Sequence, residues 1–172
     1  AKPGDAKKDK VSIASIVNEI RQLLKIKLDS KRIVLEENYA DGLPDIYVDP
    51  DQMQQVFLNL MLNAIEALNI NGNIGIRAQL ADQKMIESYK DFFPDLKNNI
   101  KYVAVHFKDN GKGMSPEVAA KAFEPFYTTK HNGSGLGLAI VNRILNENNA
   151  FIMADSSQLQ GVAFIMMFES VS

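Results

Sequence analysis

Apolar residues recur every three or four positions in two stretches of this chain, which is the spacing of one face of a helix. The first stretch predicts a helix over residues 11–28. The second predicts a helix over residues 52–68, and Asp49 followed by Pro50 is a typical signal for its start. A third helix is expected over residues 136–146, where a glycine cluster gives way to apolar residues.

Alternating apolar and polar residues predict strands between these helices. The alternation is clearest over residues 74–80 and 103–107, and the second of these runs into Asp109. Residues 82–100 are expected to form an insertion or a long loop with a short helix. Further short strands are expected at residues 33–36, 46–48, 150–153 and 162–168. This order of elements predicts an α/β (α+β) protein, with helices covering one face of a mixed sheet.

The composition fits a single globular domain and excludes several kinds of chemistry. The 172 residues are 46% hydrophobic, and 19 basic and 21 acidic residues give a net charge of −2, so no surplus of positive charge favours nucleic acid. Without cysteine the chain has no disulfide, no zinc-thiolate site and no thiol nucleophile. Its two histidines, His106 and His131, are too few for a histidine-rich metal site.

The first ten residues differ from the rest of the chain because they are polar and have no apolar centre. They do not resemble a signal peptide, and we expect residues 1–10 to be a flexible tail or a remnant of a linker. Residue 1 is alanine and not methionine, which suggests that the chain is an excised part of a longer protein. Residues 11–172 are then expected to form the single folded domain.

Two asparagines on the second predicted helix are the first candidates for chemistry. Asn59 and Asn63 are four residues apart, so their amides project from the same face, and Glu66 lies on nearly the same face. The helix is otherwise apolar almost all round and is expected to be buried, where amides need hydrogen-bond partners or a ligand. The alternative is a pair of core asparagines that are bonded to neighbouring loops.

A second candidate follows the strand that ends at Asp109. The sequence Asp-Asn-Gly-Lys-Gly-Met over residues 109–114 puts a carboxylate at the end of an apolar strand, ahead of a glycine-rich turn. The carboxylate can accept a hydrogen bond from an exocyclic amine, and the glycines allow a flat ring to approach the backbone. Taken alone, this motif is also compatible with a plain turn after a strand.

Two further motifs suit the binding of phosphate. Gly-Ser-Gly-Leu-Gly-Leu at residues 133–138 opens a helix, whose unpaired amide groups favour anions, although it is neither a P-loop nor a dinucleotide-binding pattern. Before it, Phe123 and Phe126 flank Glu-Pro and are expected to anchor a loop. The ligand candidates in this segment are Thr128, Thr129 and Lys130.

Together, the four motifs resemble the boxes of the catalytic, ATP-binding domain of sensor histidine kinases, in the superfamily that includes gyrase, the Hsp90 chaperones and the MutL mismatch-repair proteins. NLMLNAIEA resembles the N box, DNGKGM the G1 box, FEPF the F box and GSGLGL the G2 box. The segment PFYTTKHNGSGLGLAIV is particularly similar to the nitrogen-regulation type of these kinases. The resemblance covers roughly residues 11–168 and implies the two-layer α/β sandwich (Bergerat) fold of the superfamily.

The resemblance implies a role for each motif in binding ATP and Mg²⁺. Asn63 matches the residue that binds the metal, and magnesium prefers oxygen ligands such as an amide oxygen. Asp109 matches the carboxylate that accepts the amino group of adenine. Residues 114–134 match a flexible lid. The expected nucleotide contacts are Asn59, Asn63, Ala67, Asp109, Gly111, Gly113, Met114, Thr128, Thr129, Lys130, Gly133, Gly135, Leu136, Gly137 and Leu138.

Position 59 separates relatives that hydrolyse ATP from those that transfer its phosphate. The hydrolysing relatives place a glutamate there to activate water, whereas Asn59 cannot act as a base. The resemblance therefore implies transfer to a histidine imidazole, with the domain supplying positioning and charge neutralisation. The expected catalytic residues are Asn59, Glu66, which would orient the incoming group, and Lys130.

Three departures from the family pattern stand out. Many sensor kinases have a lysine where this chain has Glu66, so a phosphate-binding cation is missing, and Lys130 is expected to replace it. The glycine-threonine box appears as Gly161-Val162, without the hydroxyl, which predicts the loss of a contact on the adenine side. The usual His-Gly-Gly after the third helix is Asn-Asn-Ala at residues 148–150, which we interpret as a structural change.

The histidine that accepts the phosphate is expected on a dimerisation domain that this chain lacks. His106, in a strand, and His131, in the lid, are not followed by the acid of an acceptor site. The expected partners are that domain and then a response-regulator aspartate, with no nucleic acid. The resemblance implies a cytoplasmic location and leaves open a membrane anchor on the parent protein. It also implies a homodimeric full-length protein, whereas this chain alone is expected to be a monomer with little autophosphorylation.

Two other functions stay open at this point. One is a degenerate domain that binds a nucleotide or nothing and acts as an interaction module, which the altered segment at Gly161 motivates. The other is a serine kinase of the anti-sigma-factor type, against which Asn59 argues.

Overall fold

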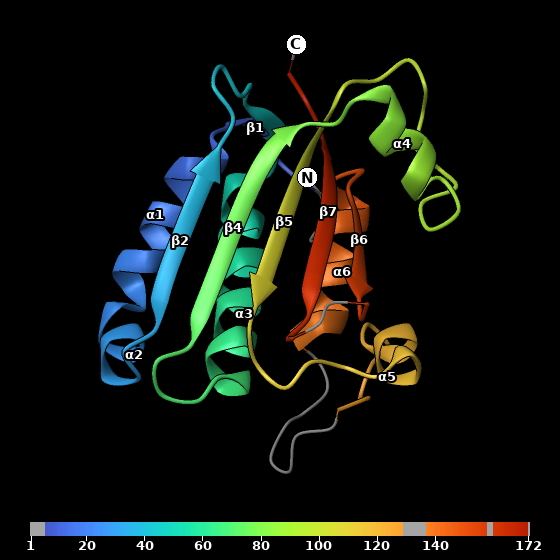
Figure 1. Ribbon diagram of the computed structural model, residues 1–172. Coiled ribbons are helices and arrows are strands. Elements are labelled where there is room, and N and C mark those ends of the chain that lie inside the picture. The colour runs from blue at the N-terminus through green and yellow to red at the C-terminus, as the bar shows by residue number, and fades with distance from the viewer. Residues whose placement is uncertain (1–5, 129–136, 158–159, 172) are drawn as a thin grey trace.

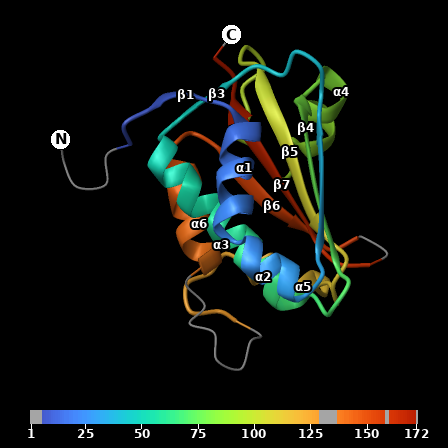
Figure 2. The ribbon, with the colours of Figure 1, turned by 90° about the vertical axis from the view of Figure 1, so that its left-hand side faces the viewer.

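The computed structural model describes residues 6–128, 137–157 and 160–171, which form a sheet and a layer of helices (Figures 1 and 2). In chain order the elements are β1 (Asp9–Val11), α1 (Ile13–Leu23), α2 (Lys25–Ser30), β2 (Val34–Tyr39), β3 (Ile46–Val48), α3 (Pro50–Ala67), β4 (Asn73–Leu80), α4 (Gln83–Tyr89), β5 (Tyr102–Asp109), α5 (Pro116–Lys121), α6 (Gly137–Glu147), β6 (Phe151–Asp155) and β7 (Ala163–Glu169).

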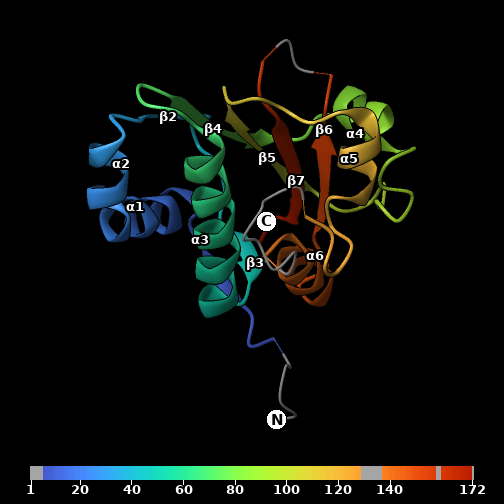
Figure 3. The ribbon, with the colours of Figure 1, turned by 90° about the horizontal axis from the view of Figure 1, so that it is seen from below.

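The main sheet is mixed, and its strand order is β2-β4-β5-β7-β6. β2 and β4 are parallel, and the other neighbouring strands are antiparallel. α1, α3 and α6 lie on one face of this sheet (Figures 2 and 3). The predicted mixed sheet with a layer of helices on one face is therefore confirmed, although the short helix α4 lies on the other face. In the ranges that the structure describes, no helix is long and apolar enough to cross a membrane.

Side-chain caps determine where two of the helices begin. The Ser12 hydroxyl accepts a hydrogen bond from a backbone N–H of α1, and the Asp49 carboxylate accepts two from the first turn of α3, at 3.0 and 3.2 Å. These bonds satisfy N–H groups that have no partner inside the helix. The single helix expected over residues 11–28 is instead two helices, α1 and α2, because the backbone leaves the helical conformation at Leu24.

The N-terminal segment is attached to the start of α3. β1 pairs antiparallel with β3, which directly precedes α3. The backbone N–H of Lys7 also donates a hydrogen bond of 2.8 Å to the Asp49 carboxylate. A strand thus begins at Asp9, inside the range that was expected to be a tail.

The main core fills the space between the sheet and the layer of α1, α3 and α6. α3 contributes Phe57, Leu60 and Met61, and the sheet contributes Phe107 and Phe164, all at most 1% exposed. Full burial of each such side chain is worth about 1.5–3 kcal/mol. This packing holds α3 firmly against the sheet and so fixes the polar side of the helix.

Residues 82–100 build a second, smaller core on the opposite face of the sheet. Ile86 of α4, together with Phe93 and Leu96 after it, is buried against residues of β5 and β7 that point away from the main core. Phe93 and Phe151 of β6 lie with their ring centroids 5.7 Å apart. The expected insertion is therefore a cover for the sheet, and it explains why residues 102–105 are buried at every position (Figure 1).

A buried asparagine joins the C-terminal end of α6 to the N-terminal end of α3. Asn148 is 1% exposed, its Oδ1 accepts a hydrogen bond from the Asp49 backbone, and its Nδ2 donates to Gln52 and to Ile144, each at 2.8 Å. Asn149 follows in the left-handed conformation, with φ of 56°, which asparagine tolerates better than most residues. This confirms a structural role for the Asn-Asn pair at residues 148–149.

Replacing Asn148 by alanine is expected to lower the free energy of unfolding by roughly 1–3 kcal/mol, because the buried groups that it bonds lose their partners. Urea denaturation of the two proteins measures this difference. Asn146→Ala is the matched control, since Asn146 is exposed on the same helix. Equal stability of the two variants would contradict the role given to the buried amide.

Candidate functional site

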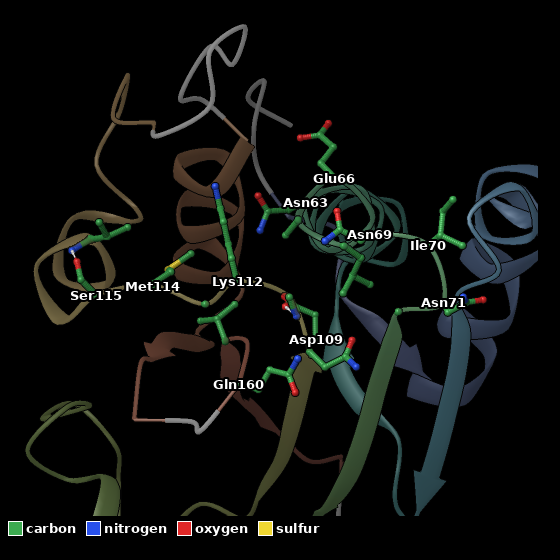
Figure 4. A pocket seen from close by; sticks show the side chains of 18 residues that line it. Asn63, Glu66, Asn69, Ile70, Asn71, Asp109, Lys112, Met114, Ser115 and Gln160 are labelled. Carbon is green, nitrogen blue, oxygen red and sulfur yellow. Dashed lines mark hydrogen bonds between the residues drawn. The ribbon is translucent and has the colours of Figure 1, made fainter.

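The described residues form a pocket at the end of the sheet where β5 stops (Figure 4). Its volume is about 1010 Å³, and its walls come from the end of α3 with the loop that leads to β4, the turn after β5 with the start of α5, and the segment before β7. Three segments that are far apart in the sequence, residues 63–72, 109–118 and 160–162, therefore meet here. The lining residues are Asn63, Glu66, Ala67, Leu68, Asn69, Ile70, Asn71, Gly72, Asp109, Asn110, Gly111, Lys112, Gly113, Met114, Ser115, Val118, Gln160 and Val162.

Asp109 is the buried charge of this pocket. Its side chain is only 2% exposed, and its Oδ1 accepts a hydrogen bond of 2.8 Å from the backbone N–H of Gly111. Burial raises the pKa of the Asp109 carboxyl above its usual value, and backbone hydrogen bonds to Gly111 and Val162 oppose this rise. A buried carboxylate that lines a cavity is suited to accept a hydrogen bond from a ligand.

Glycines allow the backbones around Asp109 to come into contact. A side chain on Gly161, where φ is +79°, would place its Cβ 1.8 Å from the carbonyl oxygen of Asp109. A Cβ on Gly113, where φ is +76°, would lie 2.9 Å from the carbonyl oxygen of Gly161. A Cβ on Gly111 would lie 2.7 Å from the carbonyl oxygen of Ala67, at the end of α3. Only glycine fits at these contacts, which bring the walls of the pocket together.

The polar side of α3 faces the pocket and the start of α6. Asn63, Glu66 and Ala67 line the pocket, and Asn59, one turn earlier, donates a hydrogen bond of 3.4 Å to the carbonyl oxygen of Gly137. The expectation that α3 is buried all round is therefore wrong on this side. Asn59 and Asn63 are half-buried and Glu66 is exposed.

The remaining expected site residues line the pocket, lie elsewhere among the described residues, or lie outside the described residues. Met114 lines the pocket, whereas Leu138 follows Gly137 at the start of α6. Thr128 is exposed and is not among the lining residues. Thr129, Lys130, Gly133, Gly135 and Leu136 lie outside the described residues.

The two aromatic residues of the Phe-Glu-Pro-Phe motif have different environments. Phe123 packs against Phe164 with ring centroids 6.0 Å apart, which confirms it as a hydrophobic anchor. Phe126 is 76% exposed with φ of 67°, so the expectation that it also anchors the loop is wrong. Within the expected lid, the residues before Phe123 form the short helix α5, which Ser115 caps.

The loop between α3 and β4 was not predicted from the sequence as part of the site, yet its Asn69, Ile70 and Asn71 line the pocket. Lys31 shapes this loop, since its ammonium group donates to the carbonyl oxygens of Ile65 and Leu68 at 2.7 and 3.1 Å. A lysine at the end of a helix is a known capping signal, but here it comes from more than 30 residues away, so local spacing could not reveal it.

The fold and the pocket define an α/β sandwich with a buried carboxylate beside a glycine-rich turn, and comparison with known proteins names its family. Residues 48–171 match the family described as histidine kinase-, DNA gyrase B-, and HSP90-like ATPases. The chain belongs to this family.

Named relatives and solved structures agree with this assignment. Sporulation kinase E of Bacillus subtilis (strain 168) is 30% identical over 95% of this chain and 20% of the relative. The sensory histidine kinase/phosphatase NtrB of Rhizobium meliloti (strain 1021) is 32% identical over 91% of this chain and 40% of the relative. The nucleotide-free catalytic domain of the histidine kinase ThkA superposes with a TM-score of 0.76 at 25% identity, over 95% of this chain and 98% of that domain. The chain thus spans less than half the length of these curated relatives.

Asp109→Asn is expected to maintain or raise the melting temperature while lowering the affinity for an adenine nucleotide. Because burial raises the pKa of the Asp109 carboxyl in the folded state, ionising it lowers the free energy of unfolding at pH values above that raised pKa. At pH values below the pKa that the carboxyl has in the unfolded chain, it is protonated in both states and this destabilisation is absent. The variant removes the charge and should melt at the same or a higher temperature at pH 7. Its affinity for an adenine nucleotide should fall about 10- to 100-fold, because a charged hydrogen bond is lost.

Thermal melting and calorimetric titration measure the two effects, and Asp41→Asn, at an exposed turn residue, is the control for the change in net charge. A clearly lower melting temperature together with unchanged nucleotide affinity would show that Asp109 has only a structural role.

Proposed function

We propose that this chain is the ATP-binding catalytic domain of a two-component sensor histidine kinase, and that it transfers the γ-phosphoryl group of ATP to a histidine on a separate dimerisation domain. The observation that carries the proposal is the buried Asp109 carboxylate, which lines the same pocket as Asn63 in a chain of this ATPase family.

The pocket fits an adenine nucleotide in chemistry and in size. Asp109 would accept the hydrogen bond of the adenine amino group, and Met114 would pack on the ring, while Gly111 and Gly113 shape the pocket through their close backbone contacts. The volume of about 1010 Å³ exceeds what one nucleotide needs. One structure with the same fold, that of full-length ShkA, was solved in complex with AMPPNP, which is consistent with this use of the fold (TM-score 0.77, 22% identity, over the whole of this chain and 33% of that one).

Magnesium would be held mainly by the nucleotide itself. Among the described residues, no group of three or more His, Cys, Asp or Glu side chains is placed to hold a metal ion. Asn63 lines the pocket and would contribute one amide oxygen, in keeping with the preference of magnesium for phosphates, waters and few protein ligands. The ion supplies charge neutralisation at the phosphates when it is bound.

The residues around the phosphate side of the pocket favour transfer over hydrolysis. An amide at position 59 cannot take a proton from water, and Asn59 instead bonds to Gly137 at the start of α6. In the proposed step the imidazole nitrogen of the acceptor forms a bond to the γ-phosphorus while the bond to the β–γ bridging oxygen breaks, and ADP leaves. Glu66 would orient the acceptor, and Lys130 would supply positive charge.

The acceptor histidine is proposed to lie on another domain, because neither histidine of this chain suits the role. His106 lies in β5, and its Nδ1 is buried without a hydrogen-bond partner among the described residues. Burial lowers the pKa of His106, and the side chain lies outside the pocket. His131 lies outside the described residues. The phosphoryl group would then pass to an aspartate of a response regulator.

The two other functions that the sequence left open make different predictions. A degenerate interaction module would lack nucleotide binding or transfer. The missing threonine hydroxyl of the glycine-threonine box favours this reading, since Val162 lines the pocket in its place. Gly161, however, keeps the backbone contact with Asp109 that shapes the pocket. A serine kinase of the anti-sigma-factor type would label serine.

Transfer to a supplied acceptor domain tests the proposal. With γ-labelled ATP and Mg²⁺, the chain should label a histidine of a separately produced dimerisation domain, as an acid-labile and base-stable phosphoryl group. Asn63→Ala should lower this rate at least about tenfold, because an expected metal contact is lost. Asn146→Ala, on the exposed side of α6, should keep the wild-type rate.

Binding of the nucleotide without any transfer would support the degenerate module instead. Label that resists acid and is lost in base would point to the serine kinase. Either result would contradict the proposed histidine kinase activity.

A further inference from the structure

We propose that Lys112 binds the phosphate chain of the nucleotide, as a second cation beside Lys130. This inference rests on the proposed function, because it assigns one more contact to the same site. It concerns the turn after β5, whose middle residue is Lys112, between Gly111 and Gly113.

The charges of the pocket point to this residue. Among the described residues that line the pocket, the acidic side chains are Glu66 and Asp109, and Lys112 is the single basic one. The formal charges of these described lining residues sum to −1 before any ligand binds. A triphosphate entering this pocket needs a compensating positive charge, and Lys112 is the described lining residue that can provide it.

The shape of the turn brings Lys112 to the phosphate side. Asp109 and the adenine contacts proposed above lie at the base of the turn, whereas Asn63, the proposed metal ligand, lies on the helix across the pocket. Figure 4 shows the Lys112 side chain extending from the turn toward the side of the pocket where Asn63 lies, and away from Gln160. An extended Lys112 side chain can thus reach from the adenine side of the pocket to the phosphate side.

The ammonium group of Lys112 is available for this contact. The side chain is exposed, and within the described part of the chain it forms no hydrogen bond or ion pair. Binding a phosphate therefore breaks no existing contact of Lys112. The left-handed conformation of Gly113, with φ of +76°, also fixes the backbone next to Lys112, so the direction of the side chain is partly set before a ligand binds.

Paired titrations separate a phosphate contact from a general effect on the pocket. Lys112→Met should weaken binding of the ATP analogue AMPPNP about tenfold and leave adenosine binding unchanged, because adenosine carries the base and ribose without phosphates. The dissociation constant of AMPPNP should also rise less steeply with salt in this variant. Lys112→Arg should recover most of the affinity.

The matched control is Lys101→Met. It makes the same change in net charge at an exposed residue that precedes β5, at the opposite end of the strand from Asp109. This variant should bind both ligands like the wild-type chain.

Two outcomes would overturn the role of Lys112 while leaving the proposed function intact. One is wild-type affinity of Lys112→Met for AMPPNP. The other is an equal loss of AMPPNP and adenosine affinity, which would indicate a damaged pocket. Failure of the wild-type chain to bind AMPPNP would instead overturn the proposed function itself.

Discussion

The contact between Gly161 and the backbone of Asp109 is the constraint on which the functional end of this domain depends. Any side chain at residue 161 would place an atom 1.8 Å from the Asp109 carbonyl oxygen. Because glycine removes that obstacle, the segment before β7 lies directly against the end of β5, and Gly113 packs against Gly161 in turn. The buried Asp109 carboxylate is thereby fixed at the floor of the pocket, at a position where burial makes its charge costly.

The rest of the fold keeps the two walls of this pocket, α3 and the end of the sheet at Asp109, in fixed positions relative to each other. The main core fixes α3 against the sheet, and Asn148 with Asp49 ties the far ends of α3 and α6 together. Midway along α3, the Asn59 amide bonds to Gly137 at the start of α6, so a second side-chain contact joins the two helices. On the other face of the sheet, the packing of residues 82–100 stiffens β5 and β7, the strands that lead to Asp109 and from Gly161.

Local sequence signals predicted the elements better than the contacts between them. The helix start after Asp49 and the strands around residues 74–80 and 103–107 follow from capping and periodicity, and the structure has them within a few residues. Asp109, Gly111 and Asn63 could be singled out because their motifs are contiguous, and all three line the pocket. Three other features could not be predicted, because each depends on partners that are distant in sequence. They are the Lys31 cap, the Asn148 network and the cover formed by residues 82–100. Phe126 shows the opposite error, since an aromatic residue in a motif does not have to be buried.

We propose that this pocket recognises adenine through its amino group, and a nucleotide that lacks this group tests the contact. Inosine triphosphate keeps the ribose and phosphates of ATP but has a carbonyl oxygen in place of the amino group. Next to the Asp109 carboxylate that oxygen would leave two acceptors without a proton between them. Calorimetric titration of the wild-type chain with both nucleotides should therefore give an affinity for inosine triphosphate at least about tenfold below that for ATP. Equal affinities, or no binding of ATP, would contradict the account.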